Sequence, residues 1–302
     1  SENLIAGNQM SRRSTFMFGN TIARGPAAHV GSGLGPGLPQ GTISLIAPTE
    51  EISGRGTQRV VDGVTIEFID AAGTEAPAEF MFYLPERRAL CTAEVVTATF
   101  HNLLTPRGAK VRDALGWTRA IDHVLETYGD RSDVVFASHH WPTWGHENVE
   151  SLLTQQRDIY RYVHDQTLRN ANAGATMFEA AEAVEEPAFE SEADAFNTRG
   201  YYGTLNHNAK AVYQYYFGWW GGVPAGYNAL PHAVTAVRYV DAMGGADATL
   251  ALGAEAFEAG DFRWAAEVFN HVVFADPDNE AARNWLAATY EQLGFQAESG
   301  AW

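Results

Sequence analysis

The spacing of apolar residues in this chain changes near Trp144, and this change limits the folds that the chain can adopt. Before that residue, short apolar and partly β-branched runs alternate with Gly, Pro and charged residues, which is typical of strands. We expect strands at residues 42–47, 64–69, 80–84, 89–91 and 134–137, and a helix at residues 118–126. Strands followed by a helix and one further strand predict an α/β layered domain.

In the second part of the chain, apolar residues recur three and four positions apart, as they do on one face of a helix. This spacing predicts an amphipathic helix over residues 148–165. Thr176, followed three residues later by Glu179, has the pattern of a capping box and predicts the start of another helix. Two more helices are expected at residues 208–217 and 233–242.

The C-terminal end of the chain contains a repeat signal of the tetratricopeptide type. The matching positions are Gly253, Ala256, Gly260, Asp261, Phe262, Ala265, Phe269 and Pro277. One and a half copies are too few for a free-standing solenoid, so this region should pack on the preceding domain or on another chain. The end of a helical bundle explains the same residues equally well.

Composition excludes several classes of protein. The 302 residues include 20 Lys and Arg against 37 Asp and Glu, a net charge of −17, which argues against nucleic acid as the main partner. No apolar run approaches the roughly 20 residues that a membrane-spanning helix needs. The single cysteine, Cys91, excludes an intrachain disulfide and a multi-cysteine zinc site. No leader-like segment is visible at Ser1, so the sequence predicts no compartment.

Residues 31–36, Gly-Ser-Gly-Leu-Gly-Pro, imitate a dinucleotide-binding fingerprint. The sixth position is Pro36, and more prolines follow where the fingerprint requires a helix to begin. We therefore interpret residues 21–41, which are rich in Gly and Pro, as a long loop that binds no nucleotide cofactor.

Three ionisable positions follow predicted strands. Glu75 lies in the connection Gly-Thr-Glu-Ala-Pro-Ala-Glu, Glu94 ends the run Ala-Leu-Cys-Thr-Ala-Glu, and His139 and His140 follow the strand at residues 134–137. Oxygen and nitrogen donors from several strand ends suit Zn²⁺ or another divalent first-row metal. Taken from the residues alone, solvated turn carboxylates and packing histidines explain these positions equally well.

Four motifs of the chain closely resemble those of the alkylsulfatases in the metallo-β-lactamase superfamily. They are the segments around Glu75 and Glu94, His101-Asn102-Leu103 with Arg107-Gly108-Ala109, and Ser138-His139-His140-Trp141-Pro142. The similarity continues through residues 199–208, 241–246 and 271–277, and so covers nearly the whole chain. Enzymes of that family hydrolyse alkyl sulfate esters, such as dodecyl sulfate, to an alcohol and sulfate.

The resemblance implies a fold in two domains. Residues 1–175 would be the C-terminal part of the catalytic domain, which is the second half of an αββα metallo-β-lactamase sandwich. Residues 176–302 would form an all-α, tetratricopeptide-like region through which members of the family dimerise. A homodimer is therefore expected.

The resemblance also implies a centre of two zinc ions. Glu75 would bind the first ion, His139 the second, and Glu94 would bridge both. A carboxylate between the ions offsets their mutual repulsion, and such a pair of ions generates hydroxide from metal-bound water near neutral pH.

The same resemblance assigns the substrate's sulfate group to Arg107, because a planar guanidinium can pair with two sulfate oxygens. Asn102 and His207 are expected to supply further polar contacts or to protonate the leaving group. An apolar channel would hold the alkyl tail. The expected partner is therefore a small-molecule alkyl sulfate.

The chain departs from the family in its histidines. The family's other metal ligands come from a His-x-His-x-Asp-His motif, and none of the 10 histidines here forms a His-x-His pair. Four of the seven ligands that the resemblance implies are missing, so we interpret the sequence as part of a longer enzyme. Two other functions stay open: an inactive module for structure or dimerisation, and a metallo-β-lactamase-fold hydrolase of another ester.

Overall fold

The computed structural model describes residues 7–26, 28–37, 42, 44, 46–54, 56–188 and 196–302. The chain forms two compact units, which are described one at a time: Ser1–Gly222 with Ser299–Ala301, and Val223–Glu298 with Trp302. The domain boundary expected at residue 175 lies inside the first unit, just before α5 (Met177–Glu182).

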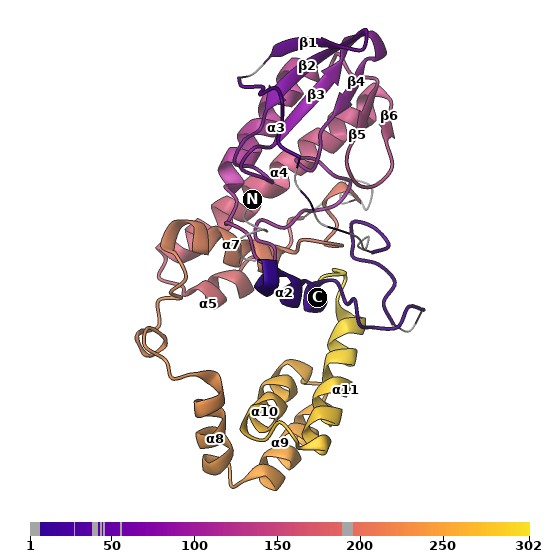
Figure 1. The fold of residues 1–302 in the computed structure, drawn as a ribbon. Helices are drawn as coiled ribbons and strands as arrows, with labels where there is room; N and C mark the ends of the chain where they lie inside the picture. Colours follow the sequence, from indigo (N-terminus) through magenta and orange to yellow (C-terminus); the bar gives the residue numbers. More distant parts are fainter. Residues whose placement is uncertain are drawn as a thin grey trace. The chain divides into compact units, whose positions relative to one another are not determined.

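The first unit combines a sheet with several helices (Figure 1). The strands are β1 (Thr57–Val61), β2 (Val64–Asp70), β3 (Phe80–Leu84), β4 (Ala89–Cys91), β5 (Val134–Phe136) and β6 (Thr143–Trp144). The helices are α2 (Gly7–Met17), α3 (Ala114–Tyr128), α4 (His146–Asn172), α5 and α7 (Leu205–Phe217), with short 3₁₀ turns η1 (Pro85–Arg87) and η2 (Phe196–Thr198).

Strands that are neighbours in the sheet are also neighbours along the chain, in the order β1-β2-β3-β4-β5-β6. Adjacent strands are antiparallel except β4 and β5, which are parallel because α3 lies between them and returns the chain to the same end of the sheet. Cys91 pairs with Phe136 at the carboxyl ends of these two strands. The residues that follow them are therefore brought together at one end of the sheet.

The inner face of the sheet packs against α3 and α4, which lie on the same side of it (Figure 1). Ile69, Met81 and Leu90 are fully buried on this face. In the helical layer, the rings of Trp117 and Tyr160 stack with their centroids 4.7 Å apart. This apolar core holds the strand ends, and the turns that follow them, in fixed positions.

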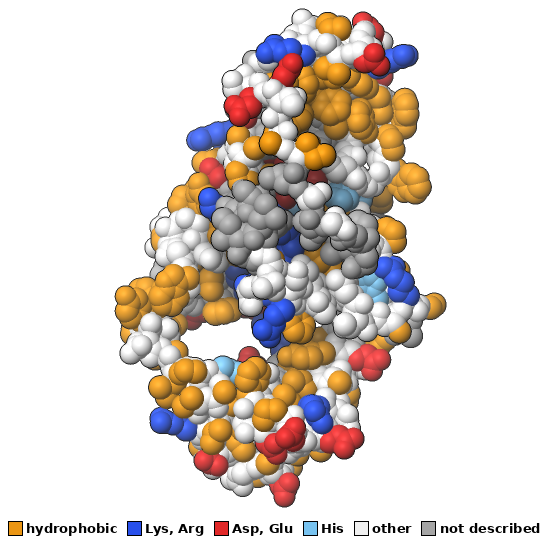
Figure 2. All heavy atoms as spheres, in the orientation of Figure 1, with side chains coloured by type: hydrophobic (Ala, Val, Ile, Leu, Met, Phe, Trp, Pro, Cys, Tyr) orange, Lys and Arg blue, Asp and Glu red, His pale blue; other side chains and the backbone are white. Residues whose placement is uncertain are grey.

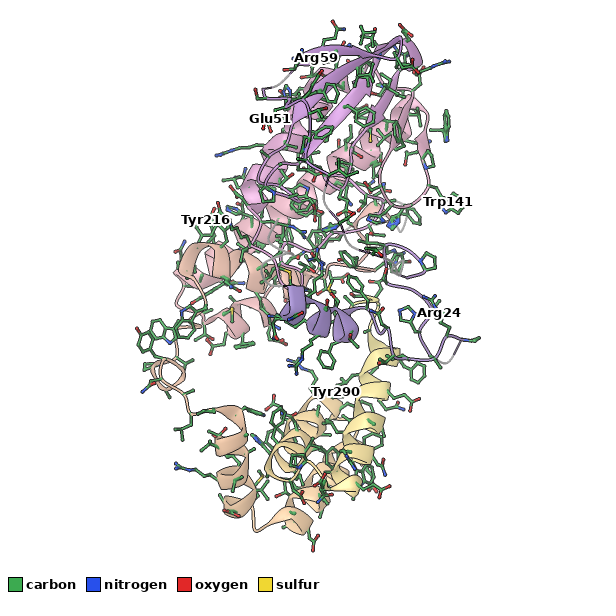
Figure 3. The ribbon with its side chains drawn as sticks, in the orientation of Figure 1. Arg24, Glu51, Arg59, Trp141, Tyr216 and Tyr290 are labelled. Carbon is green, nitrogen blue, oxygen red and sulfur yellow. The ribbon has the colours of Figure 1, made fainter. Side chains whose placement is uncertain are left out.

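The opposite face of the sheet carries aromatic side chains that are partly exposed. Phe68 and Phe80 are in edge-to-face contact with their centroids 5.6 Å apart, and Phe82 and Phe136 make a similar contact at 6.0 Å. Figure 2 shows hydrophobic side chains gathered over this part of the unit. Trp141, which is 90% exposed, extends away from the protein in the segment after β5 (Figure 3).

Four of the five strands expected from the sequence are confirmed as β2 to β5, each to within one residue. The strand expected at residues 42–47 does not form at positions 42, 44, 46 and 47, and positions 43 and 45 lie outside the described residues. An apolar run forms a strand only where a neighbouring strand pairs with its backbone. The sequence does not predict β1, which is polar and mostly exposed, or β6, which has two residues.

The helices expected in the first unit form as α3, α4 and α7, and each is longer than its pattern predicts. Helix α7 begins at Leu205 because the hydroxyl of Thr204 accepts a hydrogen bond from the backbone N–H of His207 at 3.1 Å. The capping box is confirmed, with the N–H of Thr176 donating to Glu179 Oε2 at 2.8 Å.

The second unit is helical. Its elements are η3 (Pro224–Gly226), α8 (His232–Ala242), α9 (Ala246–Glu258), α10 (Phe262–Ala275) and α11 (Glu280–Gln296). Helix α10 packs against α8, α9 and α11, and the ring of Phe269 stacks on Trp285 with the centroids 5.5 Å apart. Pro277 follows the end of α10 as expected, and the tetratricopeptide assignment stays a prediction. Among the described helices of both units, none has the length and apolar character to cross a membrane.

Candidate active site

A cavity of about 620 Å³ lies in the first unit, and several of the predicted site residues line it. Its acidic, basic and histidine lining residues are Glu75, Glu94, His101, Arg107, Arg112 and His139. Another part of the wall is formed by Met10 of helix α2, by Phe18 just after it, and by Leu34 and Pro36 of the loop rich in Gly and Pro, here called the Gly-rich loop. The cavity therefore combines carboxylates, imidazoles and guanidinium groups with an apolar wall.

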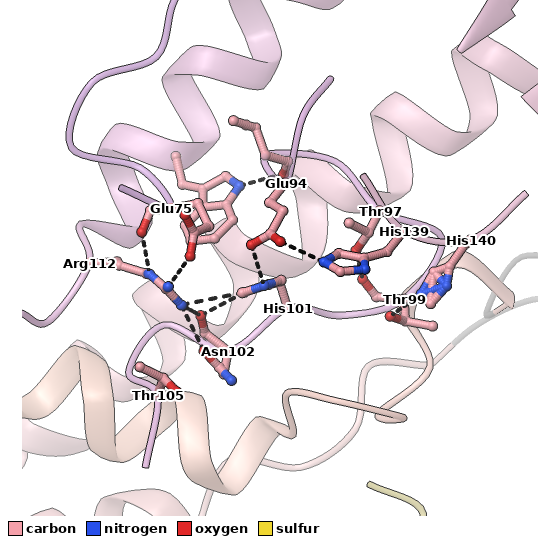
Figure 4. A network of polar contacts seen from close by, with 12 residues as sticks. Glu75, Glu94, Thr97, Thr99, His101, Asn102, Thr105, Arg112, His139 and His140 are labelled. Atoms are coloured by element: carbon pink, nitrogen blue, oxygen red, sulfur yellow. Dashed lines mark hydrogen bonds and ion pairs between the residues drawn. The ribbon is translucent and has the colours of Figure 1, made fainter. Parts of the chain in front are cut away.

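Glu94 and His139 come together because they follow the parallel strands β4 and β5. The backbone N–H of Ser138 donates to Ala93 O at 3.0 Å, which ties the two turns to each other. His139 Nε2 lies 2.5 Å from Glu94 Oε1 (Figure 4). This hydrogen bond raises the pKa of His139. Burial acts to raise the pKa of Glu94, but the interactions of its carboxylate with the imidazoles of His101 and His139 outweigh burial and lower it.

Glu75 reaches the same place from the connection between β2 and β3. One ligand atom each from Glu75, Glu94 and His101 lies within 4.8 Å of the others. His101 Nδ1 lies 3.0 Å from Asn102 O, and its Nε2 faces the carboxylates, 3.5 Å from Glu94 Oε2 (Figure 4). Within the described residues, this buried Nε2 has no hydrogen-bond partner.

This set of donors fits a divalent metal ion. When Nδ1 of His101 carries the proton, Nε2 presents a lone pair to the cavity, which is the form of imidazole that binds metals. Burial, together with the charge of Glu75, raises the pKa of nearby Glu79 to about 7, so carboxylates in this part of the unit lie close enough to repel one another. A cation bound here would give His101 Nε2 a partner and would offset the repulsion between the carboxylates.

Two arginines also line the cavity. Arg112 is 7% exposed and forms an ion pair with Glu75. Arg107 is half-buried, and its Nη1 lies 3.3 Å from Gly108 O. In the described part of the chain Arg107 has no ion-pair partner, so its guanidinium is available to an anion that enters the cavity.

Two of the residues predicted to touch the substrate do not line this cavity. Asn102 is fully buried, and its Oδ1 accepts a hydrogen bond from Arg112 Nη1 at 2.7 Å. His207 lies in the first turn of α7, where burial lowers its pKa to about 4, so that its imidazole is neutral near pH 7. Their contact with the substrate stays a prediction that the cavity lining does not support.

Sequence reasoning missed the contributions of Arg112, of α2 and of the Gly-rich loop. That loop has a role because it forms a wall of the cavity. Gly33 has a φ of +85°, and a Cβ there would lie 2.7 Å from the carbonyl carbon of Tyr201, so the loop requires glycine. The feature of the sequence that marks this loop is the regular spacing of its glycines. Arg112 has no local signal, because only its distant partners distinguish it from an exposed arginine.

Comparison with known proteins finds similarity to alkylsulfatases over the whole chain. The alkyl sulfatase dimerisation family matches residues 176–302. Over 301 residues, the chain is 50% identical to a linear primary-alkylsulfatase of Pseudomonas sp. and covers 44% of it. It is 46% identical to the alkyl/aryl-sulfatase BDS1 of Saccharomyces cerevisiae and covers 46% of that protein. The structure of the stereoselective inverting sec-alkylsulfatase Pisa1 from Pseudomonas sp. matches all of this chain and 48% of Pisa1, with 43% identity and a TM-score of 0.96.

The mixed sheet, with carboxylates and imidazoles gathered at a cavity, thus occurs in a chain whose relatives are named as sulfatases. Over its whole length the chain is similar to alkylsulfatases, and residues 176–302 match the alkyl sulfatase dimerisation family. It spans about half the length of the curated relatives that it matches.

Proposed function

We propose that this chain supplies part of the active site of a zinc-dependent alkylsulfatase, which hydrolyses alkyl sulfate esters such as dodecyl sulfate. One observation carries the proposal: a single cavity joins a carboxylate–imidazole cluster, an available guanidinium and an apolar wall. These are the three surfaces that a metal centre, a sulfate group and an alkyl chain require. The names of the relatives support the same substrate class.

Glu75, Glu94 and His139 are proposed to hold two zinc ions, with His101 as an additional nitrogen donor beside them. Bound zinc would activate water for attack on the ester and stabilise negative charge. Arg107 would pair with the sulfate oxygens. His207 does not line the cavity, and its role in protonating the leaving group stays a prediction.

Residues 1–175 are proposed to correspond to the second half of a metallo-β-lactamase-like sandwich, and residues 176–302 to a tetratricopeptide-like region. The dimerisation family that matches residues 176–302 suggests a homodimer. An inactive dimerisation module and a hydrolase of another ester are the alternatives. Zinc binding separates the proposed enzyme from an inactive dimerisation module. Comparing the turnover of dodecyl sulfate with that of a carboxylic or phosphate ester separates it from a hydrolase of another ester.

The first test is zinc binding by the 302-residue chain, measured by equilibrium dialysis. We expect weak binding, because these residues supply three of the seven implied ligands and an incomplete set lowers affinity. Glu94→Gln should weaken binding at least about tenfold, the scale on which metal sites respond to altered ligand environments. The exposed Glu86→Gln is the matched control. Equal zinc affinity in wild type and both variants would contradict the proposed metal site.

The second test is turnover. With three of the implied ligands, the chain by itself should release little sulfate from dodecyl sulfate, and robust turnover abolished by a chelator would contradict this expectation.

In a protein with the complete ligand set, Arg107→Ala should lower kcat/KM at least about tenfold, because a charge-assisted pair is lost. The exposed Arg87→Ala serves as its control. A change of less than about twofold for Arg107→Ala would remove this residue from the sulfate site.

A further inference from the structure

One buried guanidinium connects the carboxylate side of the cavity with the segment that carries Arg107. Arg112 Nε donates to the backbone oxygen of Glu75 at 2.6 Å, and its Nη2 pairs with the Glu75 carboxylate. On its other side, Nη1 donates to both the backbone oxygen and Oδ1 of Asn102, each at 2.7 Å (Figure 4). Arg112 therefore contacts the backbone and the side chain of each of two segments.

The second of these segments leads directly into the loop at residues 103–112, which presents Arg107. The backbone closes this loop, because Arg112 N–H donates to Leu103 O at 2.9 Å. A turn within it brings Gly108 N–H to 3.0 Å from Thr105 O. Both ends of the loop are thus anchored at Arg112, by its main chain and by its side chain.

Stabilisation of the fold does not by itself explain why a buried arginine lies between Glu75 and Asn102. A buried guanidinium costs several kcal/mol of desolvation, which an ion pair offsets only when its geometry is good and the other donors are also satisfied. An apolar side chain would fill the same space without that cost. What an arginine adds is a planar fork that holds two acceptors in one fixed orientation, which the three donors of a lysine do not reproduce.

We propose that Arg112 is a positioning residue that sets the place of the metal-binding Glu75 relative to the anion-binding Arg107. The roles of Glu75 and Arg107 rest on the proposed function, whereas the contacts of Arg112 do not. Arg112 touches neither reacting atoms nor substrate in this scheme. It aligns the centre that activates water with the group that holds the sulfate, and small errors in such alignment are costly to catalysis.

Backbone hydrogen exchange of the 302-residue chain tests this role without requiring activity. In Arg112→Gln, amide exchange at residues 72–76 and 103–111 should rise at least about tenfold while exchange in α3 and α4 stays unchanged. Arg112→Lys keeps the charge and should give an intermediate rise. Arg88→Gln is the control, because Arg88 is in an exposed ion pair with Asp133 at 2.9 Å. Unchanged exchange in both segments, or a uniform rise across the first unit, would overturn the proposal.

Titrations of the same variants with Zn²⁺ and with inorganic sulfate separate this inference from the proposed function. Arg112→Gln should weaken both ligands, whereas Arg107→Ala should weaken sulfate alone and Glu75→Gln should weaken zinc alone. If the wild type binds neither ligand, the proposed function fails and the exchange result still decides the positioning role. If the wild type binds both and Arg112→Gln binds them equally well, the positioning role is wrong.

Discussion

Replacing Asn208 by Ala should destabilise the first unit by more than a typical polar substitution. Asn208 lies in α7 with no exposed surface. Its Oδ1 accepts a hydrogen bond from Leu103 N–H at 2.8 Å, and its Nδ2 donates to His101 O at 2.9 Å. One side chain therefore satisfies two buried backbone groups of the segment that carries His101 into the cavity.

The size of the effect follows from these two contacts. An orphaned buried donor or acceptor costs about 1–3 kcal/mol, and two are orphaned here, so Asn208→Ala should lower the free energy of unfolding by about 2–6 kcal/mol. Asn208→Asp keeps the acceptor for Leu103 but places a carboxylate oxygen against His101 O. It should therefore also destabilise, most strongly at pH values where the carboxyl is ionised.

Urea-induced unfolding, followed by far-UV circular dichroism, measures this change for the transition of the first unit. Asn148→Ala is the matched control, because Asn148 is exposed and donates one hydrogen bond to Trp144 O at 2.8 Å. Its effect should stay within about 0.5 kcal/mol. The reasoning is refuted if Asn208→Ala costs no more than the control, since the two buried backbone groups would then be satisfied in another way.

Two further predictions concern other parts of the chain. Gly253→Ala should destabilise the second unit by about 1–3 kcal/mol through overpacking, because a Cβ there would lie 2.7 Å from Phe269 Cζ. Gly294→Ala in α11 should raise the thermal midpoint, because a Cβ there would meet no atom within 4 Å. A lower midpoint for Gly294→Ala than for Gly253→Ala would contradict this account. The pKa of Glu79 is raised to about 7 from 4.5, mainly by burial, so ionising it opposes folding. The metal-free chain should lose stability as the pH rises from about 5 to about 8, and Glu79→Gln should flatten this profile; parallel profiles would refute it.

Much of the secondary structure was predictable because its causes are local. The four strands β2 to β5 have apolar runs bounded by turn residues, and the start of α5 follows from Thr176 and Glu179 alone. The expectation of a metal site at strand ends came from the positions of Glu94 and His139. The parallel pairing of β4 and β5 is what brings these two side chains to 2.5 Å.

The remaining parts of the site depend on contacts between distant positions. Arg112 lies 37 residues from Glu75, and Asn208 lies 107 residues from His101. Nothing near Arg112 or Asn208 in the sequence distinguishes them from exposed polar residues. A buried polar group is stable only with its partners, and those partners exist only once the chain has folded.

The sequence by itself therefore determined most of the strands and helices, and which family motifs the chain carries, because periodicity, capping and motif spacing are properties of neighbouring residues. The tertiary structure alone decided that α2 and the Gly-rich loop form a cavity wall, that Arg112 anchors the loop of Arg107, and that His207 lies outside the cavity. Packing between elements decides these features, because burial and hydrogen bonding depend on which surfaces meet.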